Sequence, residues 1–258
     1  MAHVIAVAGK GGVGKTSTAH ALITGLHAYG YKVLAIDLDP QTNLTYTSGN
    51  FPDLPTLYDA FTGKASIQDV ITKSSVGYDV TPGDISFSSA DMEFTAKNKT
   101  FILKGLLEPI KENYDYCIID TPPTLGILTI NALSTSDKAI IPMNADIYSA
   151  QGLSQLWSLM DSVRTYCNPD LIAAGILINR FNARSVINRQ INDSIYDIAK
   201  TLNTHVFMSH IREAVAVKEV QYMQGSLFRD YPSAKVTSDY WHFIDEFLGK
   251  PVVINTIK

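Results

Sequence analysis

The sequence predicts an α/β fold, a doubly wound and mostly parallel β-sheet flanked by helices. Short apolar segments, typical of strands buried on both faces, alternate along the chain with longer segments of helical periodicity. A glycine-rich motif that fits a phosphate-binding loop directly follows the first apolar segment. The 258 residues, 46% of them hydrophobic, suffice for one substantial core. We therefore expect a single domain over 1–258, with a disordered tail over about 249–258.

The apolar segments are the predicted strands, in chain order 3–8, 32–37, 78–80, 114–120, 138–143, 172–179 and 204–208. The predicted helices lie between and after them, at 15–29, 56–62, 88–110, 124–134, 149–166, 184–202 and 233–248. The stretches 48–55 and 81–89 are predicted to be surface loops. Ligands of such sheets bind at the carboxyl ends of the strands, so functional residues are expected there.

The composition argues against several classes of protein. No run of about 18 apolar residues occurs, so we expect no membrane-spanning helix. Cys117 and Cys167 lie far apart and have no His at metal-ligand spacing, which predicts two small core residues rather than metal ligands. The net charge of -4 argues against a protein that coats nucleic acid over its whole surface, but it is compatible with a local basic patch.

The segment AVAGKGGVGKTSTAHAL, residues 6–22, carries the phosphate-binding motif. Its residues 9–16, GKGGVGKT, fit G-x-x-x-x-G-K-[ST] at every fixed position, between a predicted strand and a predicted helix. The glycines let backbone N–H groups approach phosphates, the helix start adds a positive dipole end, and Lys15 supplies a point charge. Thr16 is placed to ligate Mg²⁺ through its hydroxyl. Lys10 is a second cation, which an ordinary phosphate loop does not need.

Three aspartates follow predicted strands at the edge of the sheet that carries this loop. Asp120 ends YDYCIID, where a carboxylate would meet the Mg²⁺ shell. Asp37 and Asp39 follow VLAI, and strand alternation places them on the same side, with Asp39 further into the loop. Asp39 is therefore the candidate that orients an attacking water. Strand-terminal aspartates also serve as caps and turn residues, which is the alternative for each.

These residues carry a resemblance to a known family. KGGVGKT with its additional lysine, DLDPQTN, and DTPPTLGILTINALSTSDKAIIPMNADIYSAQGL together resemble the deviant Walker A ATPases of the ParA/MinD family. The DPQ after the second strand is most similar to ParA partition ATPases. The resemblance runs from about Val4 to about Leu248 and implies a P-loop NTPase that binds ATP and Mg²⁺ and hydrolyses ATP to ADP and phosphate.

The family implies a role for each site residue. Lys10 would reach the phosphates bound by the other subunit of a nucleotide-sandwich homodimer, while Lys15 acts within its own subunit; an exposed loop lysine is the alternative for Lys10. Asp39 would position water and Asp120 would be the Walker B acid. The implied nucleotide-binding set is Gly11, Gly12, Val13, Gly14, Lys15, Thr16, Ser17 and Asn179, and the implied metal set is Thr16, Asp37 and Asp120.

Asn179 follows a predicted strand at the position that commonly reads adenine in this family. A side-chain amide can pair with the adenine edge by one donor and one acceptor. A strand-end turn residue is the alternative. The segment 208–220 occupies the place of a further nucleotide-contacting loop of the family, but Ser209 and His210 stand where Pro and Arg are frequent. The resemblance therefore gives little support for nucleotide contacts in that segment.

By the same resemblance, the ATP-bound dimer would bind nonspecific double-stranded DNA, and a ParB-like centromere-binding protein would stimulate hydrolysis. We expect a cytoplasmic, nucleoid-associated protein. AGKGG and KTST in place of the NQKGG and KTTT of chromosomal relatives point to a plasmid or mobile-element branch. Basic residues of the C-terminal part are the candidates for DNA contacts, with an ordinary solvated surface as the alternative: Arg180, Arg184, Arg189, Arg212, Lys218, Arg229 and Lys235.

Two other functions remain as alternatives. A MinD-like membrane-associated positioning ATPase would carry a basic amphipathic C-terminal helix. This chain ends YWHFIDEFLGKPVVINTIK, where Asp245 and Glu246 interrupt such a face, so we expect no membrane binding. A redox relative with an iron–sulfur cluster between subunits would need cysteines that this sequence lacks at suitable positions.

Overall fold

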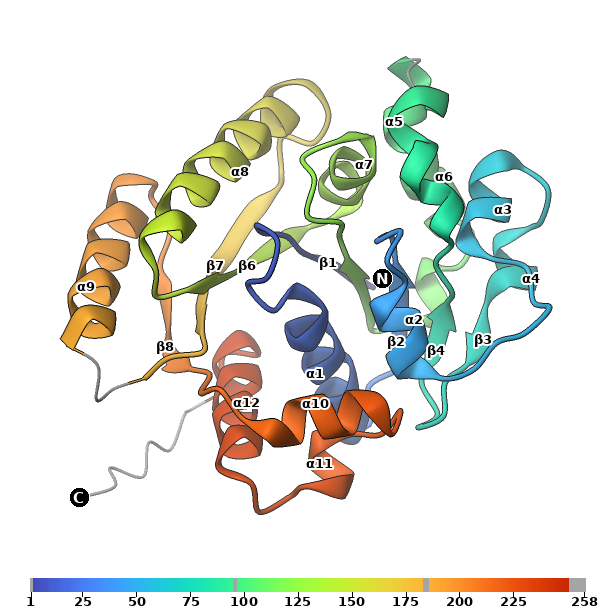
Figure 1. The fold of residues 1–258 in the computed structure, drawn as a ribbon. Helices are drawn as coiled ribbons and strands as arrows, with labels where there is room; N and C mark the ends of the chain where they lie inside the picture. The colour runs from blue at the N-terminus through green and yellow to red at the C-terminus, as the bar shows by residue number, and fades with distance from the viewer. Residues whose placement is uncertain (1, 95–96, 183–185, 251–258) are drawn as a thin grey trace.

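The computed structural model describes residues 2–94, 97–182 and 186–250. Within these residues one sheet has eight strands in the order β3-β4-β2-β5-β1-β6-β7-β8 (Figure 1). All neighbouring strands are parallel except β3 and β4, so the predicted doubly wound, mostly parallel α/β fold is confirmed. The strands are β1 (His3–Val7), β2 (Val33–Asp37), β3 (Thr72–Lys73), β4 (Asp79–Thr81), β5 (Tyr116–Asp120), β6 (Lys138–Asn144), β7 (Ile172–Asn179) and β8 (Val206–His210).

Helices cover both faces of the sheet (Figure 1). One face carries α1 (Lys15–Ala28), α10 (Val215–Tyr222), α11 (Leu227–Asp230) and α12 (Lys235–Phe247). The other carries α3 (Leu57–Thr62), α4 (Ile67–Val70), α6 (Ile102–Leu107), α7 (Ile127–Thr135), α8 (Ile147–Tyr166) and α9 (Val186–Thr201). The short α2 (Asn43–Ser48) and α5 (Ala90–Glu93) and the 3-10 helices η1 (Ile85–Ser89), η2 (Lys97–Phe101) and η3 (Lys111–Asn113) complete the described elements.

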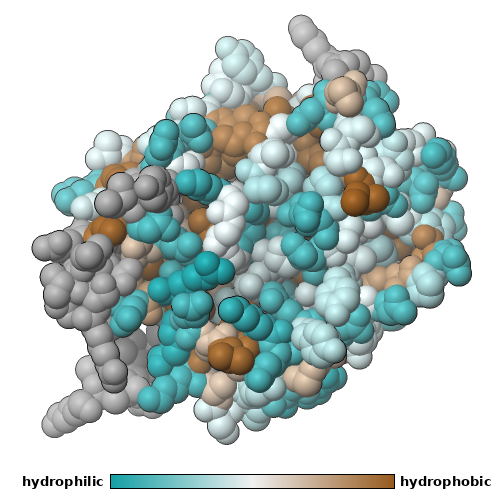
Figure 2. Space-filling model, viewed as in Figure 1, coloured by the Kyte–Doolittle hydropathy of each residue, from teal (hydrophilic) through white to brown (hydrophobic). Residues whose placement is uncertain are grey.

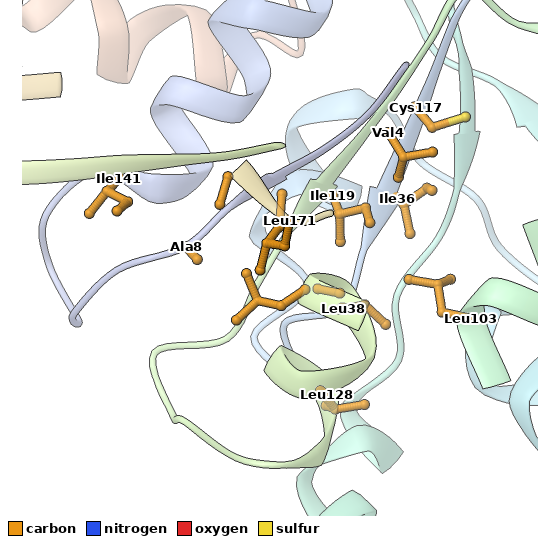
Figure 3. Close-up of a cluster of buried hydrophobic side chains, with 14 of the residues drawn as sticks. Val4, Ala8, Ile36, Leu38, Leu103, Cys117, Ile119, Leu128, Ile141 and Leu171 are labelled. Carbon is orange, nitrogen blue, oxygen red and sulfur yellow. The ribbon is translucent and has the colours of Figure 1, made fainter. Parts of the chain in front are cut away.

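The core forms because the central strands are apolar on both sides. Figure 3 shows Val4, Ile36, Cys117 and Ile119, from β1, β2 and β5, on the face of the sheet toward α7. Leu128 of α7 is fully packed against this cluster. Cys117 is a buried free thiol and Cys167 a half-buried one, as predicted for core residues. The outer surface seen in Figure 2 is mostly hydrophilic, with small hydrophobic areas.

The predicted helix over 88–110 is wrong. The chain there forms η1, α5, η2 and α6 instead, with residues 95–96 outside the described part. Tertiary partners hold the broken backbone: the Asn131 side chain accepts a hydrogen bond from Leu103 N (3.2 Å) and donates one to Lys99 O (2.8 Å). Part of the predicted loop 81–89 is likewise helical, as η1. Buried polar contacts from α7 therefore override the local helical pattern.

The C-terminal helix has nearly its predicted bounds, since α12 spans Lys235–Phe247. Residues 251–258 lie outside the described part of the chain, so the predicted tail stays a prediction. Among the described residues, no helix combines the length and apolar character that crossing a membrane requires.

Candidate functional site

The loop between β1 and α1 has the backbone that its glycines predict. Gly12 and Gly14 adopt φ of 79° and 88°, a left-handed conformation that non-glycine residues rarely take. Gly14 is also the N-cap of α1, and a Cβ on it would lie only 2.8 Å from Asn179 Nδ2. The loop thus needs glycine at this position for two reasons, the backbone angle and the contact with the end of β7.

Lys15 begins α1 and points back over the loop. Its side chain is buried, and Nζ donates a hydrogen bond to the backbone oxygen of Lys10 at 3.1 Å. Burial lowers the pKa of Lys15, while the carboxylates of Asp120 and Asp39 act in the opposite direction. An ammonium in this setting gains from an anion placed above the loop, because a phosphate would offset the desolvation.

Asp120 lies at the floor of the site, at the carboxyl end of β5. The register of the sheet sets it beside Val7 of β1 and Asp37 of β2. The Asp120 side chain is completely buried, and neither carboxylate oxygen has a hydrogen bond of normal geometry among the described residues, although the Thr16 hydroxyl lies close to it. Burial raises the pKa of Asp120 well above its ordinary value, helped by Asp37, whereas the hydroxyl of Thr16 and the ammonium of Lys15 oppose the rise.

This unpartnered carboxylate fits a cation. Two buried carboxylate oxygens and the Thr16 hydroxyl at the start of α1 supply the hard oxygen ligands that Mg²⁺ prefers. Among the described residues, no group of three or more His, Cys, Asp or Glu side chains forms a metal site. A carboxylate and a threonine hydroxyl suit an ion held by one or two protein oxygens together with phosphates and waters.

Asp37 differs from Asp120 because its oxygens are already engaged. Oδ2 accepts hydrogen bonds from Thr45 N (2.8 Å) and Thr45 Oγ1 (2.7 Å), and Oδ1 accepts one from Asp39 N (3.1 Å). Burial raises the pKa of Asp37 to about 6. Asp37 thereby anchors the start of α2, and its predicted place in the metal set stays a prediction.

A cavity of about 560 Å³, a size typical of small-molecule sites, lies over the phosphate loop. Asp39 lines it and is held in place as its Oδ1 accepts a hydrogen bond from Gln41 N at 3.0 Å. The cavity brings most of the predicted phosphate-site residues together. It is lined by Gly11, Gly12, Gly14, Lys15, Thr16, Ser17, Asp39, Gln41, Asn43, Tyr46, Thr47, Pro123, Arg180, Gln221 and Tyr222.

A smaller cavity, about 130 Å³, adjoins it and contains Asn179. Both amide hydrogens of Asn179 are used inside the protein, because Nδ2 donates to Val13 O (2.8 Å) and Thr18 Oγ1 (3.1 Å). Its Oδ1 is buried and has no partner among the described residues. Asn179 therefore offers a base an acceptor only, whereas the sequence predicted one donor and one acceptor.

The structure also brings residues to the site that the sequence did not single out. Gln221 of α10 donates a hydrogen bond from Nε2 to Ser17 Oγ at 3.0 Å, and both residues line both cavities. Tyr46 and Tyr222, both exposed, flank the larger cavity. The segment 211–221 lines the smaller one despite its departures from the family pattern. The resemblance had marked the segment 208–220 only as the place of a family loop, and no local signal marked Tyr46, Gln221 or Tyr222, because the packing of α10 brings them to the site.

Lys10 is exposed on the loop, and its side-chain carbons lie against Gly152 of α8. The loop and α8 are far apart in the sequence, so this contact was not predictable from the motif.

The basic residues predicted to contact DNA divide into several groups. Arg180, Arg212 and Lys218 line the smaller cavity. The Arg212 guanidinium pairs with Asp239 (Nε–Oδ2 2.6 Å) and that of Arg229 with Asp230 (Nε–Oδ1 2.7 Å). Lys235 is exposed at the start of α12. The positions of Arg184 and of the Arg189 side chain lie outside the described part. DNA contacts by these residues stay a prediction.

The chain is similar to known proteins over most of its length. A family model described as AAA domain matches residues 2–173. The sporulation initiation inhibitor protein Soj of Bacillus subtilis is 37% identical over 224 residues, 85% of this chain and 87% of Soj. The chromosome partitioning protein ParA of Caulobacter vibrioides is 35% identical over 233 residues, 87% of this chain and 84% of that protein.

Solved structures agree with the fold. Apo McdA of Cyanothece superposes with a TM-score of 0.85 at 25% identity, covering 96% of this chain and all of that one (100%). Cobyrinic acid a,c-diamide synthase of Mycobacterium smegmatis, with a bound ATP analogue and magnesium, superposes with a TM-score of 0.84 at 27% identity, covering 96% and 94%. The phosphate loop, the strand-end aspartates and these similarities together establish that the chain belongs to the ParA/Soj family of P-loop partition ATPases.

Proposed function

We propose that this protein is an ATP-dependent DNA partition ATPase. In this proposal it binds ATP with Mg²⁺, dimerises, binds nonspecific double-stranded DNA on the nucleoid, and leaves the DNA after hydrolysis stimulated by a ParB-like partner. The observation that supports it most is that Lys15 and Asp39 line one cavity over the phosphate loop, with the buried carboxylate of Asp120 close enough to Lys15 to affect its pKa.

The nucleotide would lie across the two cavities. Backbone N–H groups of residues 11–17 would hold the phosphates, with the Lys15 ammonium over them. The acceptor oxygen of Asn179 would receive a hydrogen bond from the adenine amino group. Thr16 and Asp120 would hold Mg²⁺, with Asp37 close behind. When bound, the ion neutralises charge that develops on the phosphate oxygens.

Hydrolysis requires a positioned water and a stabilised anion. Asp39 is oriented by its hydrogen bond from Gln41 N and would align the water for attack on the terminal phosphate. Lys15 would stabilise the charge within its own subunit, and Lys10 would reach the nucleotide of the second subunit. Binding of DNA by the closed dimer would then depend on the nucleotide, because only the dimer doubles the basic surface.

Three variants separate these steps. Lys15→Ala should abolish nucleotide binding in a fluorescent-nucleotide titration. Asp39→Ala should retain ATP, and should accumulate as a dimer by light scattering while phosphate release stops. Lys10→Ala should bind ATP but should dimerise and turn over poorly. Rapid phosphate release by Asp39→Ala would contradict its role in positioning water.

DNA binding is tested with the same proteins. Wild type and Asp39→Ala with ATP and Mg²⁺ should retard arbitrary duplex DNA at low salt, and the retardation should weaken steeply as salt rises. ADP should not support it. A wild-type protein that fails to retard DNA under every nucleotide condition, while hydrolysing ATP, would refute the DNA-binding part of the proposal.

A further inference from the structure

Gly152 lies at a helical position where glycine is unfavourable. It is an interior residue of α8, which spans Ile147–Tyr166, and glycine is less favourable than alanine inside a helix. The three heavy atoms nearest to a Cβ placed on Gly152 all belong to the side chain of Lys10: Cβ at 3.1 Å, Cδ at 3.1 Å and Cγ at 3.5 Å. The missing side chain thus leaves room that the carbons of Lys10 occupy.

We propose that Gly152 is a positioning residue for Lys10. The inference rests on the proposed function, in which Lys10 reaches the nucleotide of a second subunit. A free lysine side chain has many rotamers, and fixing them on binding costs conformational entropy. Contact with α8 restricts the first side-chain torsions of Lys10 before a second subunit arrives. Less conformational entropy is therefore lost when the dimer forms.

Other helical glycines have different surroundings, which makes this contact specific. A Cβ on Gly25 of α1 would meet the core side chains of Ile244 and Phe228. A Cβ on Gly105 of α6 would meet nothing within 4 Å. Gly105 is therefore a matched control, a helical glycine whose replacement gains helix propensity without touching the site.

Adding a methyl group at Gly152 should have two opposite effects. Alanine favours the helix and should raise the urea midpoint of unfolding, as it should at Gly105. At Gly152 the same methyl would come within 3.1 Å of Lys10 carbons, closer than ordinary van der Waals contact, and would push the lysine stem aside. Because Cγ and Cδ of Lys10 are among the contacted atoms and move with the side-chain torsions, the direction of the side chain changes. Leucine would fill this space more completely.

The experiment compares Gly152→Ala, Gly152→Leu, Gly105→Ala and Lys10→Ala with wild type, and adds the double variant Lys10→Ala/Gly152→Ala. Three quantities are measured on the full chain: the urea midpoint, the affinity for a fluorescent ADP analogue, and the dimer dissociation constant by sedimentation with a non-hydrolysable ATP analogue and Mg²⁺. We expect Gly152→Ala to weaken dimerisation by about fivefold or more and Gly152→Leu further, with nucleotide affinity within about twofold of wild type. In the Lys10→Ala background, which lacks Cγ and Cδ and keeps only Cβ, most of the effect should disappear.

The outcomes separate this inference from the proposed function. If Lys10→Ala dimerises like wild type, the role of Lys10 between subunits is wrong, and Gly152 has no such lysine to position. If Lys10→Ala is impaired but both Gly152 variants dimerise like wild type, only the inference is overturned. It is also overturned if Gly152→Ala weakens dimerisation equally without Lys10, or if nucleotide affinity falls in parallel, since the phosphate loop itself would then be disturbed.

Discussion

Asp37 and Asp120 show how residues of one type, at equivalent ends of neighbouring strands, acquire different chemistry. Asp37 has hydrogen bonds from Thr45 and Asp39, whereas the carboxylate of Asp120 has none among the described residues. A buried charge without partners is costly unless a ligand supplies them. The first acid therefore serves the local structure, and the second is suited to a cation.

Asn179 gives a prediction about base preference. Its lone unpartnered oxygen can accept a hydrogen bond from the amino group of adenine but not from the carbonyl oxygen of guanine. Asn179→Ala should reduce the preference for ATP over GTP in a competition titration. It should also lower the free energy of unfolding by about 1–3 kcal/mol, because Val13 O and the Thr18 hydroxyl lose their donor.

Asn43→Ala is the control for this prediction, since Asn43 lines only the larger cavity. It should leave the ratio of ATP to GTP affinities unchanged. An unaltered ratio in Asn179→Ala as well would rule out base reading by this amide.

His20 predicts how stability depends on pH. It is completely buried in α1, its Nε2 has no partner among the described residues, and burial lowers its pKa from 6.5 to about 4. The unfolded chain binds a proton below about pH 6.5, but the folded protein does so only near pH 4. The unfolded state thus binds more protons in this interval, and the free energy of unfolding falls as pH decreases.

His20→Leu should remove this contribution. Relative to wild type, the variant should gain about 3 kcal/mol between pH 7 and pH 4, measured by urea unfolding without nucleotide. His3→Leu, at an exposed histidine, is the control. A constant difference between His20→Leu and wild type across this range would contradict the prediction.

At the scale of elements, α7 depends on a residue from another segment. Its N-cap is Gly126, which has no side chain to cap the helix, and Asp91 of α5 accepts a hydrogen bond from Ile127 N at 2.7 Å instead. Asp91→Ala should therefore lower the free energy of unfolding by about 1 kcal/mol, measured by urea denaturation. Asp170→Ala removes the same charge from another exposed position and should cost less. Equal losses from both substitutions would argue against the cap.

The break in the predicted helix over 88–110 also results from hydrogen bonds between this segment and α7. Its sequence pattern suits one continuous helix, but Asp91 and Asn131 connect the segment to α7 by hydrogen bonds. Helix α10 illustrates the opposite case, because the sequence predicted no helix there. In the folded protein α10 packs on α1 and α2 and lines the site. Whether short helices of this kind form depends on tertiary contacts, which cannot be inferred from neighbouring residues in the sequence.

At the scale of the whole molecule, nucleotide binding should stabilise the fold. A ligand at about 100 times its dissociation constant adds about 2.7 kcal/mol to the free energy of unfolding. For a chain of this size, ATP with Mg²⁺ should raise the melting temperature by about 5–10 °C in a thermal scan. Lys15→Ala should melt at the same temperature with and without nucleotide. A comparable shift in Lys15→Ala would mean that the nucleotide binds elsewhere.

The parallel α/β fold, the phosphate loop and the aspartates at the strand ends could all be predicted from the amino-acid sequence. These are local signals: the apolar segments are short, the glycines permit the left-handed backbone conformation that the loop needs, and parallel strands end at one edge. Three further properties follow from the packing of the folded chain: which strand-end carboxylate lacks backbone partners, that Asn179 offers a base only an acceptor, and that Lys10 lies against Gly152. Those properties depend on contacts between residues far apart in the chain, and such contacts leave no periodic pattern in the sequence.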